Sequence, residues 1–173
     1  YLQGGQGNLS ADIVKKLMQE FSGRLFIEER RGKLGLGTAY IHGFKWALDK
    51  KYDYIFEMDC DFSHNPEDLI RLREACISGA DVAIGSRYVK SGKVENWPMG
   101  RVLMSYFASV YVRMVLWIGI KDTTAGFKCY KRKVLERINF DDIKFVGYAF
   151  QIEMKYTAYK LGFKIVEVQI IFI

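Results

Sequence analysis

Two aspartates separated by one residue, Asp59 and Asp61, come directly after the apolar run YIFEM at residues 54–58. If the backbone there is extended, their side chains point the same way, and two carboxylates that close repel each other unless a cation lies between them. Carboxylate oxygens suit Mg²⁺ or Mn²⁺, which keep open positions for substrate phosphates. An Asp-x-Asp pattern is common by chance, so its position at the end of a strand is what favours a divalent metal site.

Three further residues could bind a phosphate group. Arg87 follows the apolar run DVAIGS, and Arg101 and Ser105 are four positions apart. Residues at that spacing share one face of a helix, where a guanidinium beside a hydroxyl can hold a phosphate. The alternative is that they are surface residues of an amphipathic helix. His64 could also meet a metal or a phosphate, although a single His in a loop is more often a surface residue.

The elements that would position these residues follow from the spacing of apolar side chains. The spacing predicts helices at residues 11–21, 38–50, 66–78 and 147–161. It predicts strands at residues 24–28, 54–58, 81–86 and 163–173. Alternating strands and helices indicate an α/β fold with parallel pairing and right-handed crossovers. Ligands of such sheets bind beyond the carboxyl ends of the strands, where Asp59, Asp61 and Arg87 would lie.

A strongly apolar stretch covers residues 99–120. It is long enough to suggest a membrane span, but Arg113 lies in its middle, so we expect a buried or interfacial helix instead. The net charge of +6 favours anionic partners without separating nucleic acid, phosphorylated metabolites and anionic membranes. Nucleic acid ranks last, because the aromatic residues mostly fall on apolar helical faces.

The length of 173 residues fits one domain, residues 1–173. The glycine-rich start YLQGGQGN and the apolar end IIFI suggest that the chain is cut at one or both ends. Three widely spaced cysteines without a CxxC pattern indicate neither a disulfide framework nor a zinc site, and they favour a reducing compartment.

Six segments, taken in order, resemble one family. They are RRGKLGLGTAYIHGFKWAL, EMDCDFSHNPEDL, AIGSRYVKSGKVENWP, GRVLMS, DTTAGFKCY and GYAFQIEMKYTAYKLGFKIVEV. Together they are similar to the polyprenol-phosphate (dolichol-phosphate) mannosyltransferases, which are inverting family 2 glycosyltransferases. The resemblance implies the GT-A fold, a Rossmann-like and mostly parallel sheet flanked by helices.

The resemblance also implies an activity: transfer of mannose from GDP-mannose to a polyprenyl or dolichyl phosphate at the cytosolic face of a membrane. In this interpretation Asp59 and Asp61 hold the divalent metal against the donor diphosphate, and Lys33 lies near the donor. The acceptor phosphate would be bound by residues of three segments: Arg87, Arg101, Ser105, Asp122 and Gly126. Whether a membrane-anchoring partner or tail belongs to the intact protein stays open at this point.

Two segments of the family pattern do not appear in this sequence. The family opens with strands that bind the donor nucleoside, and it continues past the last strand with a basic segment near the acceptor. Two other hypotheses therefore stay open: a related glycosyltransferase that uses another sugar nucleotide such as UDP-glucose, and a non-catalytic nucleotide-binding or membrane-binding module of the same fold.

Overall fold

A computed structural model describes residues 9–28, 32 and 34–173, which divide into two compact units, residues 1–35 and 36–173. The first unit contains helix α1 (Leu9–Glu20), which confirms the helix predicted at residues 11–21. The strand predicted at residues 24–28 is wrong, because residues 25–28 have no regular structure. A strand requires a hydrogen-bonded neighbour, and none of the strands that the structure describes pairs with this short apolar run.

The second unit is built on a mixed sheet of four strands in the order β1-β4-β2-β5. The strands are β1 (Tyr54–Glu57), β4 (Lys128–Lys131), β2 (Val82–Ser86) and β5 (Ile165–Gln169). Three of them run in one direction, with β2 and β5 directly paired in parallel. The fourth, β4, was not predicted; it lies between β1 and β2 and is antiparallel to both. Within this sheet, the predicted parallel pairing of neighbouring strands therefore holds for β2 and β5 and not for the pairs that include β4.

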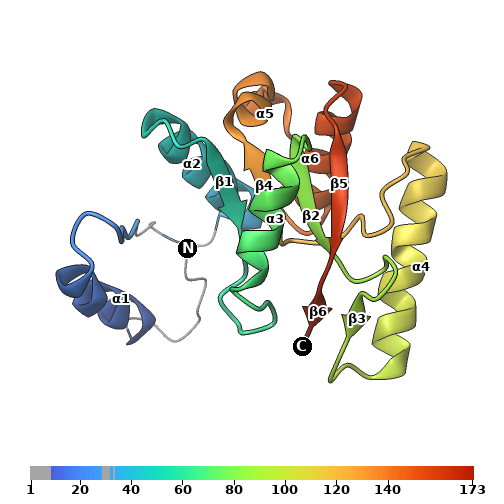
Figure 1. Cartoon of the computed structure of the whole chain (residues 1–173), viewed down its shortest axis with the longest axis horizontal. Helices are drawn as coiled ribbons and strands as arrows, with labels where there is room; N and C mark the ends of the chain where they lie inside the picture. Colours follow the sequence, from blue (N-terminus) through green and yellow to red (C-terminus); the bar gives the residue numbers. More distant parts are fainter. Residues whose placement is uncertain (1–8, 29–31, 33) are drawn as a thin grey trace. The chain divides into compact units, whose positions relative to one another are not determined.

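Helices cover both faces of this sheet, as Figure 1 shows. On one face α2 (Leu36–Asp49), α5 (Arg132–Arg137) and α6 (Ala149–Lys160) bury a core that includes Phe44 and Phe150. On the other face α3 (Asp68–Ile77) packs through Leu72 and Cys76. Alternate residues of each strand enter the two cores, as the period of a strand requires. The α/β fold predicted from the sequence is confirmed.

Beyond the carboxyl ends of β2 and β5 the chain forms a second, smaller sheet. A two-stranded parallel sheet joins β3 (Lys93–Val94) to β6 (Ile171–Phe172). Helix α4 (Met99–Leu116) follows β3 and stands beside it in Figure 1. A short 3₁₀ helix, η1 (Phe140–Asp142), connects α5 to the segment before α6.

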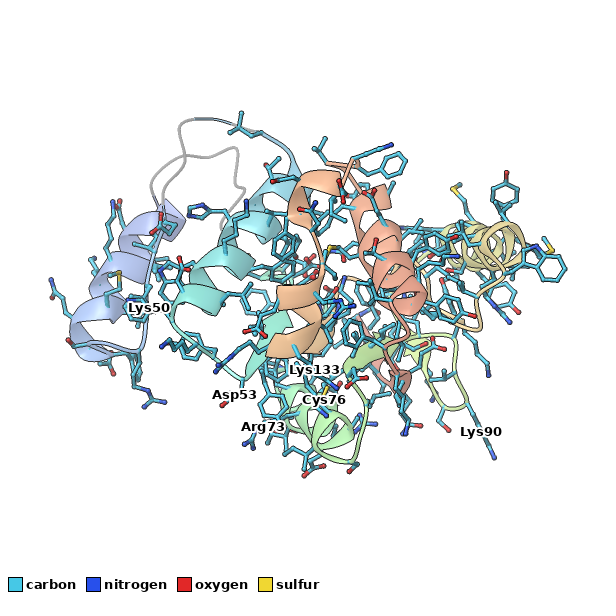
Figure 2. The ribbon with its side chains drawn as sticks, turned by 90° about the horizontal axis from the view of Figure 1, so that it is seen from above. Lys50, Asp53, Arg73, Cys76, Lys90 and Lys133 are labelled. Carbon is cyan, nitrogen blue, oxygen red and sulfur yellow. The ribbon has the colours of Figure 1, made fainter. Side chains whose placement is uncertain are left out.

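Helix α4 is apolar but exposed. Ser109 is its buried residue, so of the two alternatives expected for residues 99–120, a buried or an interfacial helix, the buried one is wrong. Large apolar side chains along α4 face solvent: Met99, Leu103, Met104, Tyr106, Phe107, Tyr111, Met114 and Val115. Figure 2 shows the side chains of this helix projecting outward from the ribbon. Within the described part of the chain, no helix combines the length and the apolarity that a membrane crossing needs.

Candidate active site

The acidic turn, residues 59–63, begins two residues after β1 ends. Asp59 is half-buried and its Oδ1 accepts a hydrogen bond from the Tyr40 hydroxyl at 3.3 Å, whereas Asp61 is exposed. The Ser63 hydroxyl and backbone N–H both donate to Asp61 Oδ1, at 2.5 and 3.1 Å. These hydrogen bonds hold the pKa of Asp61 below its usual value, so the carboxylate is favoured. Both carboxylates are thus oriented by uncharged groups.

A buried polar cluster lies beneath this turn. Glu57, the last residue of β1, forms an ion pair with Lys128 of β4, with 3.1 Å between Lys128 Nζ and Glu57 Oε2. Gln151 of α6 donates to the same Glu57 oxygen at 3.0 Å and accepts a hydrogen bond from Lys128. Burial lowers the pKa of Lys128, while the charges of Glu57 and Asp59 oppose that effect. The cluster ties β1, β4 and α6 together below the acidic turn.

A single segment, residues 121–126, crosses from the arginine side of the site to the acidic turn, and we call it the bridging loop. Lys155 of α6 is fully buried and donates from Nζ to the carbonyl oxygens of Thr123 and Ala125, at 2.7 Å each. Glu167 of β5 accepts two backbone N–H groups at the start of the loop, at 2.8 Å each. Side chains from two different elements therefore fix the backbone of this loop.

The two ends of the bridging loop contact the two groups of residues singled out in the sequence. At one end, a Cβ atom on Gly126 would lie 3.4 Å from Asp59 Oδ2, so the absence of a side chain leaves room around that carboxylate. At the other end, Asp122 binds Arg87. The loop thus connects Asp59 with Arg87, although they follow different strands.

The ion pair between Arg87 and Asp122 is almost fully buried. Arg87 donates from Nε at 2.8 Å, from one terminal nitrogen at 2.7 Å and from its backbone N–H at 3.0 Å. The same terminal nitrogen also donates to the Thr124 hydroxyl at 2.8 Å. Burial alone would raise the pKa of Asp122, but the hydrogen bonds and charge of Arg87 outweigh it and hold that pKa below its usual value. Both groups therefore stay charged.

Arg101 and Ser105 lie in the first half of α4, where Arg101 is exposed and Ser105 is half-buried. The guanidinium carbon of Arg101 lies 3.7 Å from the ring centroid of Trp97. The guanidinium carbon of Arg87 lies 5.9 Å from the same centroid. One aromatic ring therefore contacts both arginines that the sequence suggested for phosphate binding.

Most of the predicted site residues are brought to one edge of the sheet. Asp59 approaches Gly126, and Asp122 pairs with Arg87. Lys33, the predicted donor-site residue, lies outside the described residues. His64 is buried between the rings of Phe127 and Phe172 at 4.8 and 5.0 Å, which places it in the packing under the acidic turn.

Five residues that support the site were not evident from the sequence: Glu57, Lys128, Gln151, Lys155 and Trp97. A signal for one of them was present, because Glu57 shares the inward face of its strand with Ile55. A carboxylate on a buried strand face requires a partner. The position of that partner, Lys128, was not evident from the sequence.

The donor set fits a hard divalent cation. Asp59 and Asp61 offer carboxylate oxygens, and Gly126 leaves space beside Asp59. Among the residues that the structure describes, no group of three or more His, Cys, Asp or Glu side chains could hold a metal ion. A cation here would thus have two protein carboxylates and would leave positions for phosphate oxygens and water.

Comparison with known proteins was consistent with this geometry. Residues 5–138 match the family described as glycosyl transferase family 2. A protein of Mycolicibacterium smegmatis named polyprenol monophosphomannose synthase is 48% identical over 149 residues, covering 86% of this chain and 56% of that protein. A protein of Micrococcus luteus named undecaprenyl-phosphate mannosyltransferase is 46% identical over 144 residues, covering 83% of this chain and 59% of that protein. The aligned part thus spans less than two thirds of each relative.

Proposed function

This chain belongs to glycosyl transferase family 2, and we propose that it transfers mannose from GDP-mannose to the phosphate of a polyprenyl or dolichyl lipid. Its α/β architecture is the GT-A fold of that family. The two relatives support the choice of sugar and acceptor, since their names specify mannose transfer and a polyprenyl phosphate product or acceptor. The products would be polyprenyl phosphate β-mannose and GDP.

One observation carries the proposal: the bridging loop lies against Asp59 at one end and binds Arg87 at the other. Gly126 faces Asp59 and Asp122 holds Arg87, so a metal-bound diphosphate and a second phosphate would be held on either side of one rigid loop. A transferase with two anionic substrates needs this proximity, because holding the reactants together removes much of the entropic cost of their reaction.

On the donor side, Asp59 and Asp61 would hold Mg²⁺ or Mn²⁺, and Lys33 would contribute near the donor. Tyr40 and Ser63 orient the two carboxylates by hydrogen bonds. The cation, when bound, would neutralise charge on the diphosphate leaving group. The residues of the chain would keep both carboxylates in position and leave space for the diphosphate.

On the acceptor side, Arg87, Arg101 and Ser105 would bind the lipid phosphate, with Asp122 and Gly126 shaping its surroundings. A phosphate monoester is already an anion at neutral pH, so its oxygen needs no general base. That oxygen would attack the anomeric carbon of mannose as the bond from this carbon to the GDP oxygen breaks. Attack on the face opposite the leaving group would invert the configuration and give a β-linked product from an α-linked donor.

Membrane association is part of the proposal. The apolar side chains of α4 face solvent beside Arg101, and Arg113 lies on the same helix. An apolar surface with basic residues suits the interface of an anionic membrane, which is where a long-chain lipid acceptor is found. We propose that the protein is cytoplasmic and binds peripherally to the cytosolic membrane face, with an anchoring partner or tail in the intact protein.

The test is a panel of radiolabelled GDP and UDP sugars, offered to the intact protein with polyprenyl phosphate and either Mn²⁺ or Mg²⁺. We expect lipid-linked product only from GDP-mannose. Asp61→Asn should abolish transfer, whereas Asp141→Asn, a substitution at an exposed carboxylate remote in sequence from the site, should not. Transfer only from UDP-glucose would establish the alternative donor. Binding of GDP without transfer from any sugar would instead indicate a non-catalytic module.

A further inference from the structure

Trp97 contacts two positive charges and has no role in the function proposed so far. It lies in the segment between β3 and α4 and is half-buried. The Arg101 guanidinium carbon is 3.7 Å from its ring centroid, and the Arg87 guanidinium carbon is 5.9 Å away. At 3.7 Å the guanidinium lies against the ring face, where the attraction of a cation to the aromatic quadrupole is strong.

The ring is itself held in place. Phe172 of β6 packs edge-to-face against Trp97, with 5.2 Å between centroids and 82° between planes. The Phe172 carbonyl accepts a hydrogen bond from the Glu95 backbone at 2.7 Å, which ties β6 to the segment that carries Trp97. Pro98 follows immediately, and its carbonyl accepts from the Arg101 backbone at 2.9 Å as α4 begins. The ring and the arginine are thus fixed to the same helix start.

Stacking orients a guanidinium without using its hydrogen-bond donors. The five N–H groups of an arginine lie in the guanidinium plane, whereas an aromatic ring contacts the face of that plane. Over the described residues, the Arg101 side chain forms no hydrogen bond or ion pair with protein groups. All its donors therefore stay available. A carboxylate partner would also orient Arg101, but it would neutralise the charge of the guanidinium and occupy the N–H groups that a phosphate needs.

Arg87 presents the contrasting case. Its Nε and one terminal nitrogen are occupied by Asp122 and Thr124, which leaves the other terminal nitrogen for a ligand. The Trp97 ring centroid lies 5.9 Å from the guanidinium carbon of this partly occupied arginine and 3.7 Å from that of the unoccupied Arg101. The two guanidinium groups are consequently held on one ring, although like charges repel each other.

We propose that Trp97 is a positioning residue, whose ring holds the Arg101 guanidinium in the orientation that binds the acceptor phosphate through two hydrogen bonds. The inference rests on the proposed function, since it assumes that Arg101 binds the acceptor. The role of Trp97 can nevertheless be tested apart from that function. In this role the electron density of the ring, and not merely its size, sets the affinity of the protein for a phosphate monoester.

The experiment replaces Trp97 by fluorinated tryptophans, which keep the shape of the ring but weaken its quadrupole. Trp46, Trp117 and every tryptophan of the intact protein outside these 173 residues are first changed to Phe, so that Trp97 alone incorporates the analogue. Transfer is then assayed with a short-chain polyprenyl phosphate. We expect the acceptor KM to rise steadily with the number of fluorines, by about two- to fivefold in total, while the GDP-mannose KM and the melting temperature stay constant.

Substitutions complete the test. Trp97→Phe should keep most of the acceptor affinity, whereas Trp97→Leu should raise the acceptor KM by at least the fluorination effect. Trp46→Leu is the matched control, because Trp46 also faces a cation, Lys50 at 5.8 Å, away from the site. Arg101→Gln must raise the acceptor KM; if it does not, the proposed acceptor site fails. If Arg101→Gln acts but fluorination does not, the role of Trp97 is refuted and the proposed function stands.

Discussion

Replacing Asp122 by Asn should destabilise the protein far more than the same change in an exposed ion pair of similar geometry. Asp122 is fully buried and binds Arg87 through contacts of 2.7, 2.8 and 3.0 Å. Removing the negative partner of a buried pair leaves an uncompensated charge, which costs about 3–5 kcal/mol. For a domain of this size, that loss lowers the melting temperature by roughly 6–20 °C.

The matched control is Asp53→Asn. Asp53 pairs with Arg132 at 2.8 Å, but its side chain is 80% exposed, and Figure 2 labels it at the surface. Solvent screening limits such a pair to about 0–1 kcal/mol. Thermal unfolding followed by circular dichroism compares the two variants directly. Equal losses for both would refute the reasoning, because burial would then make no difference to the ion pair.

A pH series adds a second measurement on the same variants. The pKa of Asp122 is lower in the folded protein than in the unfolded chain, where it is about 3.9. Its contribution to stability is therefore fully present above about pH 3.9 and is lost as the pH falls toward the folded value. The stability gap between the wild type and Asp122→Asn should narrow below that pH. A gap that stays constant from pH 7 to pH 3 would contradict the assigned direction of the shift.

Further predictions concern the turn, the loop, the sheet and the helix. Asp61→Asn should weaken Mn²⁺-dependent binding of GDP at least tenfold by calorimetry and leave metal-free binding unchanged. Lys155→Met should speed amide hydrogen exchange in the bridging loop, because two carbonyls lose their donor. Gly85→Ala should lower the free energy of unfolding by about 1–3 kcal/mol in denaturant titrations, since its Cβ would lie 2.9 Å from a Phe ring. At Gly100 an added Cβ meets no atom within 4 Å, so Gly100→Ala should cause no such steric loss. Phe107→Asp, at a 62% exposed position, should reduce cosedimentation with anionic vesicles without lowering the melting temperature.

Local signals in the sequence predicted several elements well. The helix expected at residues 66–78 is α3 (Asp68–Ile77), and Asn65 accepts a hydrogen bond from the Glu67 backbone just before it. The helix expected at residues 147–161 is α6 (Ala149–Lys160), and Gly162 follows its end at a φ of 81°, a conformation that glycine adopts readily. These features depend on neighbouring residues along the chain, so the sequence contains the information that specifies them.

The strand β4 was missed because its pattern makes sense only in three dimensions. Its sequence KCYK begins and ends with lysine, which is unusual for a central strand. Lys128 is tolerated there because Glu57, on a strand distant in sequence, neutralises it in the core. The inserted strand also explains why β1 and β2 are not direct neighbours. The residue pattern of a single segment does not identify such a partner.

The exposure of the apolar side chains of α4 was not predictable from the sequence for a related reason. Its composition predicted a helix, and Arg113 argued against a membrane span. Whether its apolar face is covered depends on which elements reach it, and in the described chain few do. The contacts of Trp97 are of the same kind, because they join segments that only the fold brings together.

The charges of the candidate site fall into two classes, and the difference bears on function. Glu57 and Lys128 neutralise each other, so that pair is explained by the architecture alone. Asp59, Asp61 and Arg101 form no ion pair within the described chain; they are held by hydroxyl groups and an aromatic ring, which orient a charge without cancelling it. Stability alone would favour opposite charges beside them. Two oriented carboxylates and an oriented guanidinium, all left unneutralised, are better explained by ligands that bring the missing charges: a cation with its diphosphate at one end of the bridging loop and a phosphate at the other.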